Sequence, residues 1–174
     1  MKKPSFINNG IYHIYNRGVE KRKVFLDDQD HFRFIHDLFE FNDEAPALNT
    51  YYRLPYLQSY EVQLQKTRLQ KIGATNKAAG RRQRKLLVEI LAFCLMPNHY
   101  HLLIRQRIDK GAVNFMQKLG TGYTNYFNKR YERVGSLFQG RFKAVLINKE
   151  SHFIHLPYYI HLNPLDLEMP QWRE

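Results

Sequence analysis

Two apolar runs separated by a turn constrain the fold of this chain more than any other feature. Leu86 to Met96 (LLVEILAFCLM) is rich in strand-favouring residues, Pro97-Asn98 is a turn signal, and His99 to Arg105 (HYHLLIR) resumes as a second run. Two such runs joined by a tight turn predict an antiparallel hairpin. Because both runs are mainly apolar, we expect this hairpin to lie in the core of a sheet.

Other strand and helix patterns alternate around the hairpin. We expect strands at 11–15 and 138–147, and helices that begin after Asp27-Asp28, after Asp109 and at 150. This order predicts an α+β fold, with a mainly antiparallel sheet of four or five strands carrying helices on one face. The other face of the sheet is expected to stay free.

The last helix has two alternative starts because it contains Pro157. A proline is tolerated in the first turn of a helix, so the helix could begin near Leu156. If it begins at Glu150 instead, Pro157 lies inside the helix and removes one hydrogen bond. Asn163-Pro164 should end the helix, because the residue before a proline avoids the α conformation.

The charge of the chain favours a polyanionic partner. Its 174 residues, the size of one domain, carry 27 Lys and Arg against 16 Asp and Glu, a net charge of +11. Part of this excess lies in a basic insertion at about 43–85, where the stretch 66–85 holds eight basic residues and no acidic one. Within it, 62–71 has the pattern of a basic helix, and 73–84 is either a mobile basic segment that orders on a polyanion or a solvated surface insertion.

Cysteine content and hydropathy indicate a cytoplasmic protein with no membrane partner. Cys94 is the only cysteine, so neither an intrachain disulfide nor a cysteine-based zinc cluster can form. The apolar run 86–96 is much shorter than the roughly 20 residues that span a bilayer. The N-terminus has two lysines but lacks the apolar stretch of a signal peptide.

Two short motifs carry residues suited to catalysis. On a strand, His99 and His101 project to the same face, where two imidazoles can hold a divalent cation with an oxygen ligand from elsewhere. On a helix, Tyr159 and Asn163 share a face; a phenol is a candidate nucleophile and an amide oxygen suits Mg²⁺ or Mn²⁺. Each motif taken alone is more often structural than catalytic.

Together the two motifs resemble those of a known family. The stretches GIYHIYNRG (10–18), CLMPNHYHLLI (94–104), KLGTGYTNYFNKRYERVGSLFQGRFKAVLI (118–147) and YIHLNP (159–164) resemble the single-tyrosine transposase superfamily of HUH nucleases. The similarity is greatest to the REP-associated tyrosine transposases. It covers most of the chain outside the insertion, with the motifs in the family order.

The resemblance implies a fold, a substrate and a set of site residues. The fold would be a ferredoxin-like α/β sandwich, and residues 1–174 would form one transposase domain. His99, His101 and Asn163 would hold Mg²⁺ or Mn²⁺, and Tyr159 would be the nucleophile. The substrate would be single-stranded DNA with adjacent hairpins, cleaved through a 5′-phosphotyrosine intermediate and rejoined without ATP.

Several alternatives remain open at this stage. Tyr158 is a rival nucleophile, Tyr123 and Tyr126 are remote ones, and Tyr159 is favoured because Asn163 follows it by four residues. The basic residues expected to contact the DNA backbone are Arg17, Arg141 and Lys143, although ordinary solvated charges would look the same. The rival functions are an inactive, domesticated DNA- or RNA-binding regulator and, less well supported, a zinc hydrolase. The chain could act as a monomer or as a homodimer.

Overall fold

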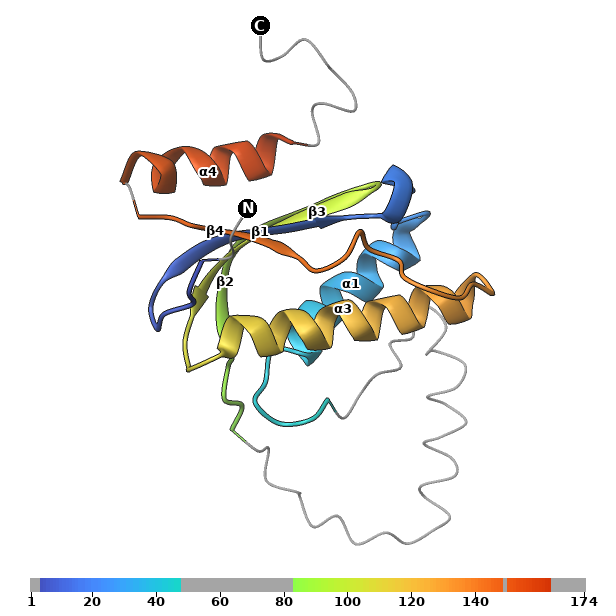
Figure 1. The fold of residues 1–174 in the computed structure, drawn as a ribbon, viewed down its shortest axis with the longest axis horizontal. Helices are drawn as coiled ribbons and strands as arrows, with labels where there is room; N and C mark the ends of the chain where they lie inside the picture. Colours follow the sequence, from blue (N-terminus) through green and yellow to red (C-terminus); the bar gives the residue numbers. More distant parts are fainter. Residues whose placement is uncertain (1–3, 48–82, 149, 164–174) are drawn as a thin grey trace, which may run out of the picture.

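One antiparallel sheet organises the protein. The computed structural model describes residues 4–47, 83–148 and 150–163 (Figure 1). The strands are β1 (Ile11–Arg17), β2 (Val88–Met96), β3 (His99–Gln106) and β4 (Lys143–Leu146), in the spatial order β2-β3-β1-β4. All neighbouring strands are antiparallel, and β2 and β3 form the predicted hairpin, although β2 lies at an edge of the sheet and only β3 is a central strand. The predicted α+β class and antiparallel sheet are therefore confirmed.

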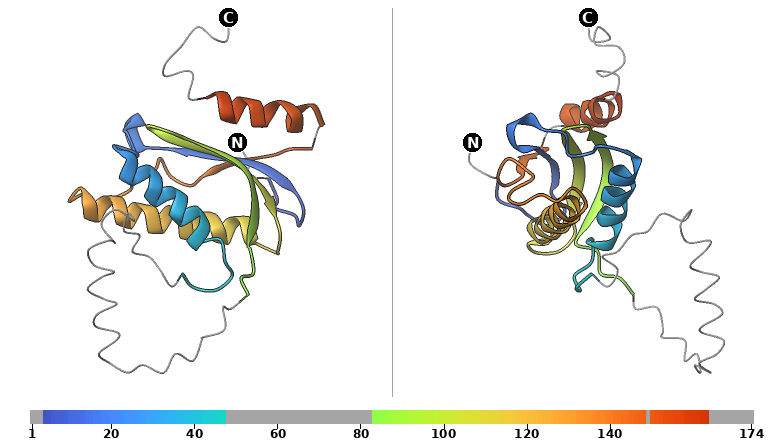
Figure 2. Two further views of the ribbon diagram at one scale, coloured as in Figure 1. Left: turned by 180° about the vertical axis from the view of Figure 1, so that it is seen from behind. Right: turned by 90° about the vertical axis from the view of Figure 1, so that its right-hand side faces the viewer.

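Helices cover both faces of this sheet. The helices α1 (Asp28–Glu40) and α3 (Gly111–Arg130) pack side by side on one face, and a short 3-10 helix, η1 (Val19–Lys21), precedes α1. The third helix, α4 (Glu150–Leu162), lies across the opposite face, as both views of Figure 2 show. The expectation that one face stays free was wrong, because α4 contacts β2 and β3 there. Within the described ranges, no helix has the length and apolarity needed to cross a membrane.

Strand alternation separates a large apolar core from a more polar face. Tyr12 and Ile14 of β1 are fully buried toward α1 and α3. The alternate residues, His13 and Tyr15, point to the α4 side. The core between the sheet and the two helices is aromatic and aliphatic; its fully buried members include Tyr12, Ile14, Phe34, Leu102, Ile104, Phe115, Leu119 and Tyr123. The polar residues of β1 are thus available to build a site under α4.

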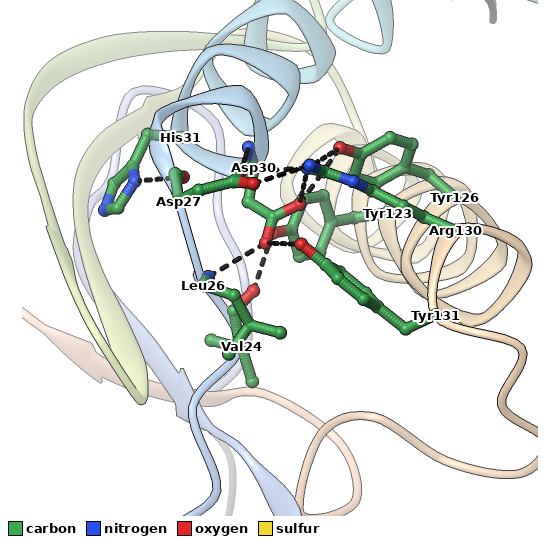
Figure 3. Close-up of polar contacts among 9 residues, drawn as sticks. All are labelled: Val24, Leu26, Asp27, Asp30, His31, Tyr123, Tyr126, Arg130 and Tyr131. Atoms are coloured by element: carbon green, nitrogen blue, oxygen red, sulfur yellow. Dashed lines mark hydrogen bonds and ion pairs between the residues drawn. The ribbon is translucent and has the colours of Figure 1, made fainter.

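A buried carboxylate joins α1 to α3 (Figure 3). Asp27 caps α1 by accepting a hydrogen bond from the backbone N–H of Asp30, at 3.1 Å. The Asp30 side chain is fully buried and is an acceptor for four donors. These donors are the Leu26 N–H (2.8 Å), Arg130 Nη1 (2.7 Å) and the hydroxyls of Tyr126 and Tyr131 (2.9 Å each). Because three of the four come from α3 and its C-terminal end, the network fixes the position of one helix on the other.

The predicted strand at 138–147 is shorter in the structure. Only 143–146 pair with β1, and Phe138 makes an isolated bridge with Gly18. Gly140 takes a φ of 73°, a left-handed conformation that an extended strand excludes, and its carbonyl accepts a hydrogen bond from Asn16 Nδ2 at 3.2 Å. The glycine therefore turns the chain between 138 and β4, and the long strand was a wrong prediction.

The two ends of the predicted insertion meet in a narrow neck. The Glu44 N–H donates to the Lys85 carbonyl at 2.9 Å, and the side chains of the same two residues form an ion pair at 3.4 Å. Nearby, the Arg84 guanidinium lies 3.9 Å from the centre of the Phe39 ring. The predicted helix at 62–71 and most of the segment 73–84 lie outside the described residues. The neck brings the chain back to β2 close to the point where it left α1.

The last helix includes the proline and docks through a small apolar cluster. The structure places the helix start at Glu150, so Pro157 lies inside it. Ile160 is fully buried and packs in a cluster with Ala92, Cys94, Met96 and Leu103 from the sheet. This cluster is much smaller than the core on the other face, so we expect α4 to be less firmly held than α1 and α3.

Labelling of Cys94 should therefore report the docking of α4. Burial leaves this thiol 6% exposed and raises its pKa to about 11, so the reactive thiolate is scarce at pH 8. Ile160→Ala removes the buried contact, which should open α4 and raise the rate of iodoacetamide labelling at least about 10-fold. His155→Ala, at an exposed position of the same helix, should leave the rate unchanged. Equal rates in both variants would show that Ile160 does not hold the helix in place.

Candidate active site

The face of the sheet under α4 gathers histidine and tyrosine side chains from two adjacent strands. In the β1–β3 register, Tyr15 pairs with His101, Arg17 with His99, and His13 with Leu103. Directly paired residues of antiparallel strands point to the same face. The register therefore brings His13 and Tyr15 next to the two histidines that the sequence singled out.

His99 and His101 lie together, as their spacing predicts. Their ring centroids are 5.0 Å apart, with the rings nearly perpendicular at 86°. Burial, followed by the charge of Arg17, lowers the pKa of His99. Burial, followed by the nearby His13 and His99, lowers the pKa of His101 to about 3. Both imidazoles are consequently neutral near pH 7, the state in which a ring nitrogen can bind a metal ion.

Hydrogen bonds occupy the same nitrogen in both rings. The Nδ1 atom of His99 lies 2.6 Å from Oδ1 of Asn98, and Nδ1 of His101 lies 2.8 Å from Nε2 of His13. Because an amide oxygen carries no hydrogen, His99 must donate through Nδ1, which leaves its Nε2 with a free lone pair. A metal-bound histidine characteristically has its other ring nitrogen held in this way. His99 therefore fits a divalent cation bound through Nε2, and His101 fits one when its Nδ1 is the donor to His13.

Oxygen ligands are needed to complete such a site. Over the described part of the chain, no group of three or more His, Cys, Asp and Glu side chains is arranged to hold a metal ion. Asn163, the predicted oxygen donor, directly follows α4 and is 4% exposed. Its backbone N–H donates to the Tyr159 carbonyl at 3.1 Å, which places it one helical turn after the tyrosine. Its assignment as a metal ligand remains a prediction.

Tyr159, on α4, lies close to His101 of the sheet. Its ring centroid lies 5.7 Å from that of His101, with the rings edge to face at 87°. The residue is 40% exposed, so its side chain is accessible to a substrate, whereas the neighbouring Tyr158 is 66% exposed. The docked α4 therefore brings the predicted nucleophile and a predicted metal ligand together within one chain.

Tyr123 and Tyr126, which are remote from Tyr159 in the sequence, make structural contacts on the other side of the sheet. Tyr123 is fully buried on the other side of the sheet, and its hydroxyl donates to the Val24 carbonyl at 2.6 Å. The Tyr126 hydroxyl donates to Asp30, and burial is the main cause that raises its pKa to about 12. Neither hydroxyl lies on the face that carries His99 and His101, so Tyr158 is the remaining rival of Tyr159.

Only two of the three predicted basic residues lie beside the histidines. Arg17 pairs with His99 in the sheet and donates from Nε to Gln139 Oε1 at 2.5 Å. Lys143 begins β4, and its Nζ lies 5.9 Å from the centre of the Tyr15 ring. Arg141 instead lines a cavity of about 840 Å³ between α3 and the segment that leads to β4. A role of any of the three in DNA binding remains a prediction.

Three residues of the site were not identified from the sequence: His13, Tyr15 and Asn98. Because His13 and Tyr15 are two residues apart on a predicted strand, the sequence alone predicts that they share a face. Their proximity to His101 depends on which strands pair and in which register. The ring of Tyr15 lies 5.8 Å from that of His101. Asn98 was recognised only as part of a turn, and its side chain also donates to the Lys21 carbonyl at 3.2 Å.

Comparisons with known structures support the fold. A structure described as a REP-associated tyrosine transposase bound to a REP hairpin is similar in fold, with a TM-score of 0.60 and 14% identity, covering 96% of this chain and 73% of that one. A candidate transposase from Deinococcus radiodurans R1 is less similar, with a TM-score of 0.44 and 14% identity, covering 92% of this chain and 96% of that one. No curated protein matches the chain significantly.

The sequence itself matches one family over most of its length. Residues 48–163 match the family described as "Transposase IS200 like", a span that includes the hairpin with its two histidines and the last helix. This match covers more than half of the 174 residues, and the fold is similar to that of a solved tyrosine transposase. The chain belongs to the IS200-like transposase family.

Proposed function

We propose that this transposase is a metal-dependent endonuclease and strand transferase that acts on single-stranded DNA through Tyr159. One observation carries the proposal: an accessible tyrosine ring lies 5.7 Å from one of two adjacent neutral histidines, all supplied by a single chain. A tyrosine with a purely structural role is expected to be buried, whereas Tyr159 is 40% exposed beside the two imidazoles.

The reaction is an in-line displacement at phosphorus. The Tyr159 hydroxyl gives up its proton and attacks the scissile phosphate, which forms a 5′-phosphotyrosine and releases a strand that ends in a 3′-hydroxyl. Because the phosphotyrosine retains the energy of the phosphodiester, attack by another 3′-hydroxyl restores the tyrosine and joins the strands without ATP. A divalent cation held by His99, His101 and Asn163 would polarise a non-bridging phosphate oxygen and offset developing negative charge.

The substrate is single-stranded DNA that carries a hairpin. The net charge of +11 attracts a polyanion, and the fold is shared with a transposase that was solved with a REP hairpin. Arg17 and Lys143 would hold the backbone of a strand that passes over the histidines, since both lie along that face. Arg141 lines the cavity beside α3, so it would contact DNA that continues past the β4 edge of the sheet.

The proposal is tested by following both ends of a cleaved oligonucleotide. Hairpin oligonucleotides with single-stranded flanks of randomised sequence are labelled at the 5′ or the 3′ end and incubated with protein and Mn²⁺ or Mg²⁺. In denaturing gels the 3′ label should migrate with the protein, and the 5′ label should appear in a short free product. EDTA should abolish both signals.

Other labelling patterns would contradict the proposal. A 5′ label on the protein would mean a 3′-phosphotyrosine and the opposite cleavage polarity. Tight binding with no adduct under any metal would favour the inactive regulator. Cleavage without a covalent adduct would indicate hydrolysis by water, as in a metal-dependent hydrolase.

A further inference from the structure

The contact between His13 and His101 has no part in the reaction described above. His13 comes from β1, a strand far from the hairpin in sequence, and its Nε2 lies 2.8 Å from Nδ1 of His101. We propose that His13 is a positioning residue that orients His101 for binding of a divalent cation. This inference rests on the proposed function, because it assumes that His101 is a ligand.

The geometry of the two rings supports a directed hydrogen bond. Their planes differ by only 20°, and their centroids are 5.0 Å apart, close to the largest separation that a 2.8 Å contact between ring nitrogens allows, so the rings lie side by side close to one plane. In that arrangement the lone pair of one nitrogen points at the N–H of the other. The His101 ring is 7% exposed, and the Tyr15 ring 5.8 Å away further limits its freedom.

The direction of the hydrogen bond follows from what a ligand requires. For Nε2 of His101 to bind a cation it must carry no hydrogen, so the ring hydrogen must be on Nδ1 and donated to His13 Nε2. His13 is then an acceptor, as Asn98 Oδ1 is for His99. The two candidate ligands thus have matching supports, an amide oxygen for one ring and an imidazole nitrogen for the other.

In this arrangement His13 supports a metal ligand and is not itself a ligand through Nε2. Its Nε2 is engaged with His101, and the ring cannot turn that nitrogen toward a cation without breaking the contact. A phenylalanine at this position would keep a ring beside Tyr15 but accept no hydrogen bond. A glutamine could present its amide oxygen near the position of Nε2, so it should restore the acceptor.

The test measures cation binding directly, without DNA. Purified full-length protein is titrated with Mn²⁺ alone, and free Mn²⁺ is followed by electron paramagnetic resonance. His13→Phe should weaken binding by about 10- to 100-fold, the usual effect of removing a partner of a ligating histidine. His13→Gln should recover binding to within a few-fold of the unaltered protein. His31→Phe, at a partly buried histidine stacked on Phe25 on the opposite side of the sheet, is the matched control and should bind normally.

The outcomes separate this inference from the proposed function. If the unaltered protein binds Mn²⁺ no better than His101→Ala does, the metal site itself fails. If the unaltered protein binds but folded His13→Phe binds equally well, His13 does not position His101 and the proposed function stands. If His13→Gln folds yet binds as weakly as His13→Phe, the hydrogen-bond role is overturned. Circular dichroism identifies a phenylalanine variant that fails to fold, and the glutamine variant then decides.

Discussion

Tyr159→Phe should abolish the covalent protein–DNA adduct and lower the rate of strand cleavage by on the order of 10⁴-fold or more. Phenylalanine keeps the ring that lies 5.7 Å from His101 and removes only the hydroxyl that we propose as the nucleophile. Affinity for the hairpin oligonucleotide should change by no more than a few-fold, because the basic residues are intact. The measurements are single-turnover cleavage, the adduct gel and a binding titration.

Tyr158→Phe is the matched control for this experiment. It changes the same atoms one residue earlier, on a residue that is 66% exposed and turned roughly 100° around the helix from Tyr159. Adduct formation should persist at close to the original rate. An adduct lost in Tyr158→Phe and retained in Tyr159→Phe would reverse the assignment. Loss in both variants would indicate that the two hydroxyls act together or that α4 is disturbed.

Local patterns in the sequence predicted most of the sheet. The 86–96 and 99–105 runs became β2 and β3 because apolar strand formers and a turn agree there. The same alternation predicted that His99 and His101 share a face, and their rings do lie together there. The prediction of a strand over 138–147 was wrong because Gly140 takes a left-handed conformation, at a point where its carbonyl accepts a hydrogen bond from Asn16 of β1.

Long-range contacts explain what the sequence could not reveal. His13 lies 88 residues before His101, and only the pairing of β1 with β3 brings their nitrogens within 2.8 Å. The position of α4 was equally inaccessible, since its periodicity does not say which face of the sheet it covers. The pattern left open whether Pro157 begins that helix or lies inside it, and the contacts of Ile160 with the sheet define where the helix docks.

The contact between α1 and α3 contains one fully buried carboxylate, and Asp30→Ala should lower the free energy of unfolding by about 2–4 kcal/mol. The fully buried Asp30 accepts hydrogen bonds from a backbone N–H, two tyrosine hydroxyls and Arg130. Removing the carboxylate leaves donors without an acceptor where water cannot replace it. Arg130 retains its ion pair with Asp27, so the loss should stay below that of a fully unpaired buried charge.

Two further variants show whether the loss comes from the network. Asp30→Asn keeps an acceptor oxygen but removes the charge, and should lie between the alanine variant and the unaltered protein in urea unfolding. Asp28→Ala, at an exposed first-turn position of the same helix, should cost less than about 1 kcal/mol. If Asp30→Ala were no more costly than Asp28→Ala, the four contacts would contribute no net stability. Because the network lies on the face opposite the histidines, any Asp30→Asn protein that remains folded should still form the Tyr159 adduct, which separates support of the fold from catalysis.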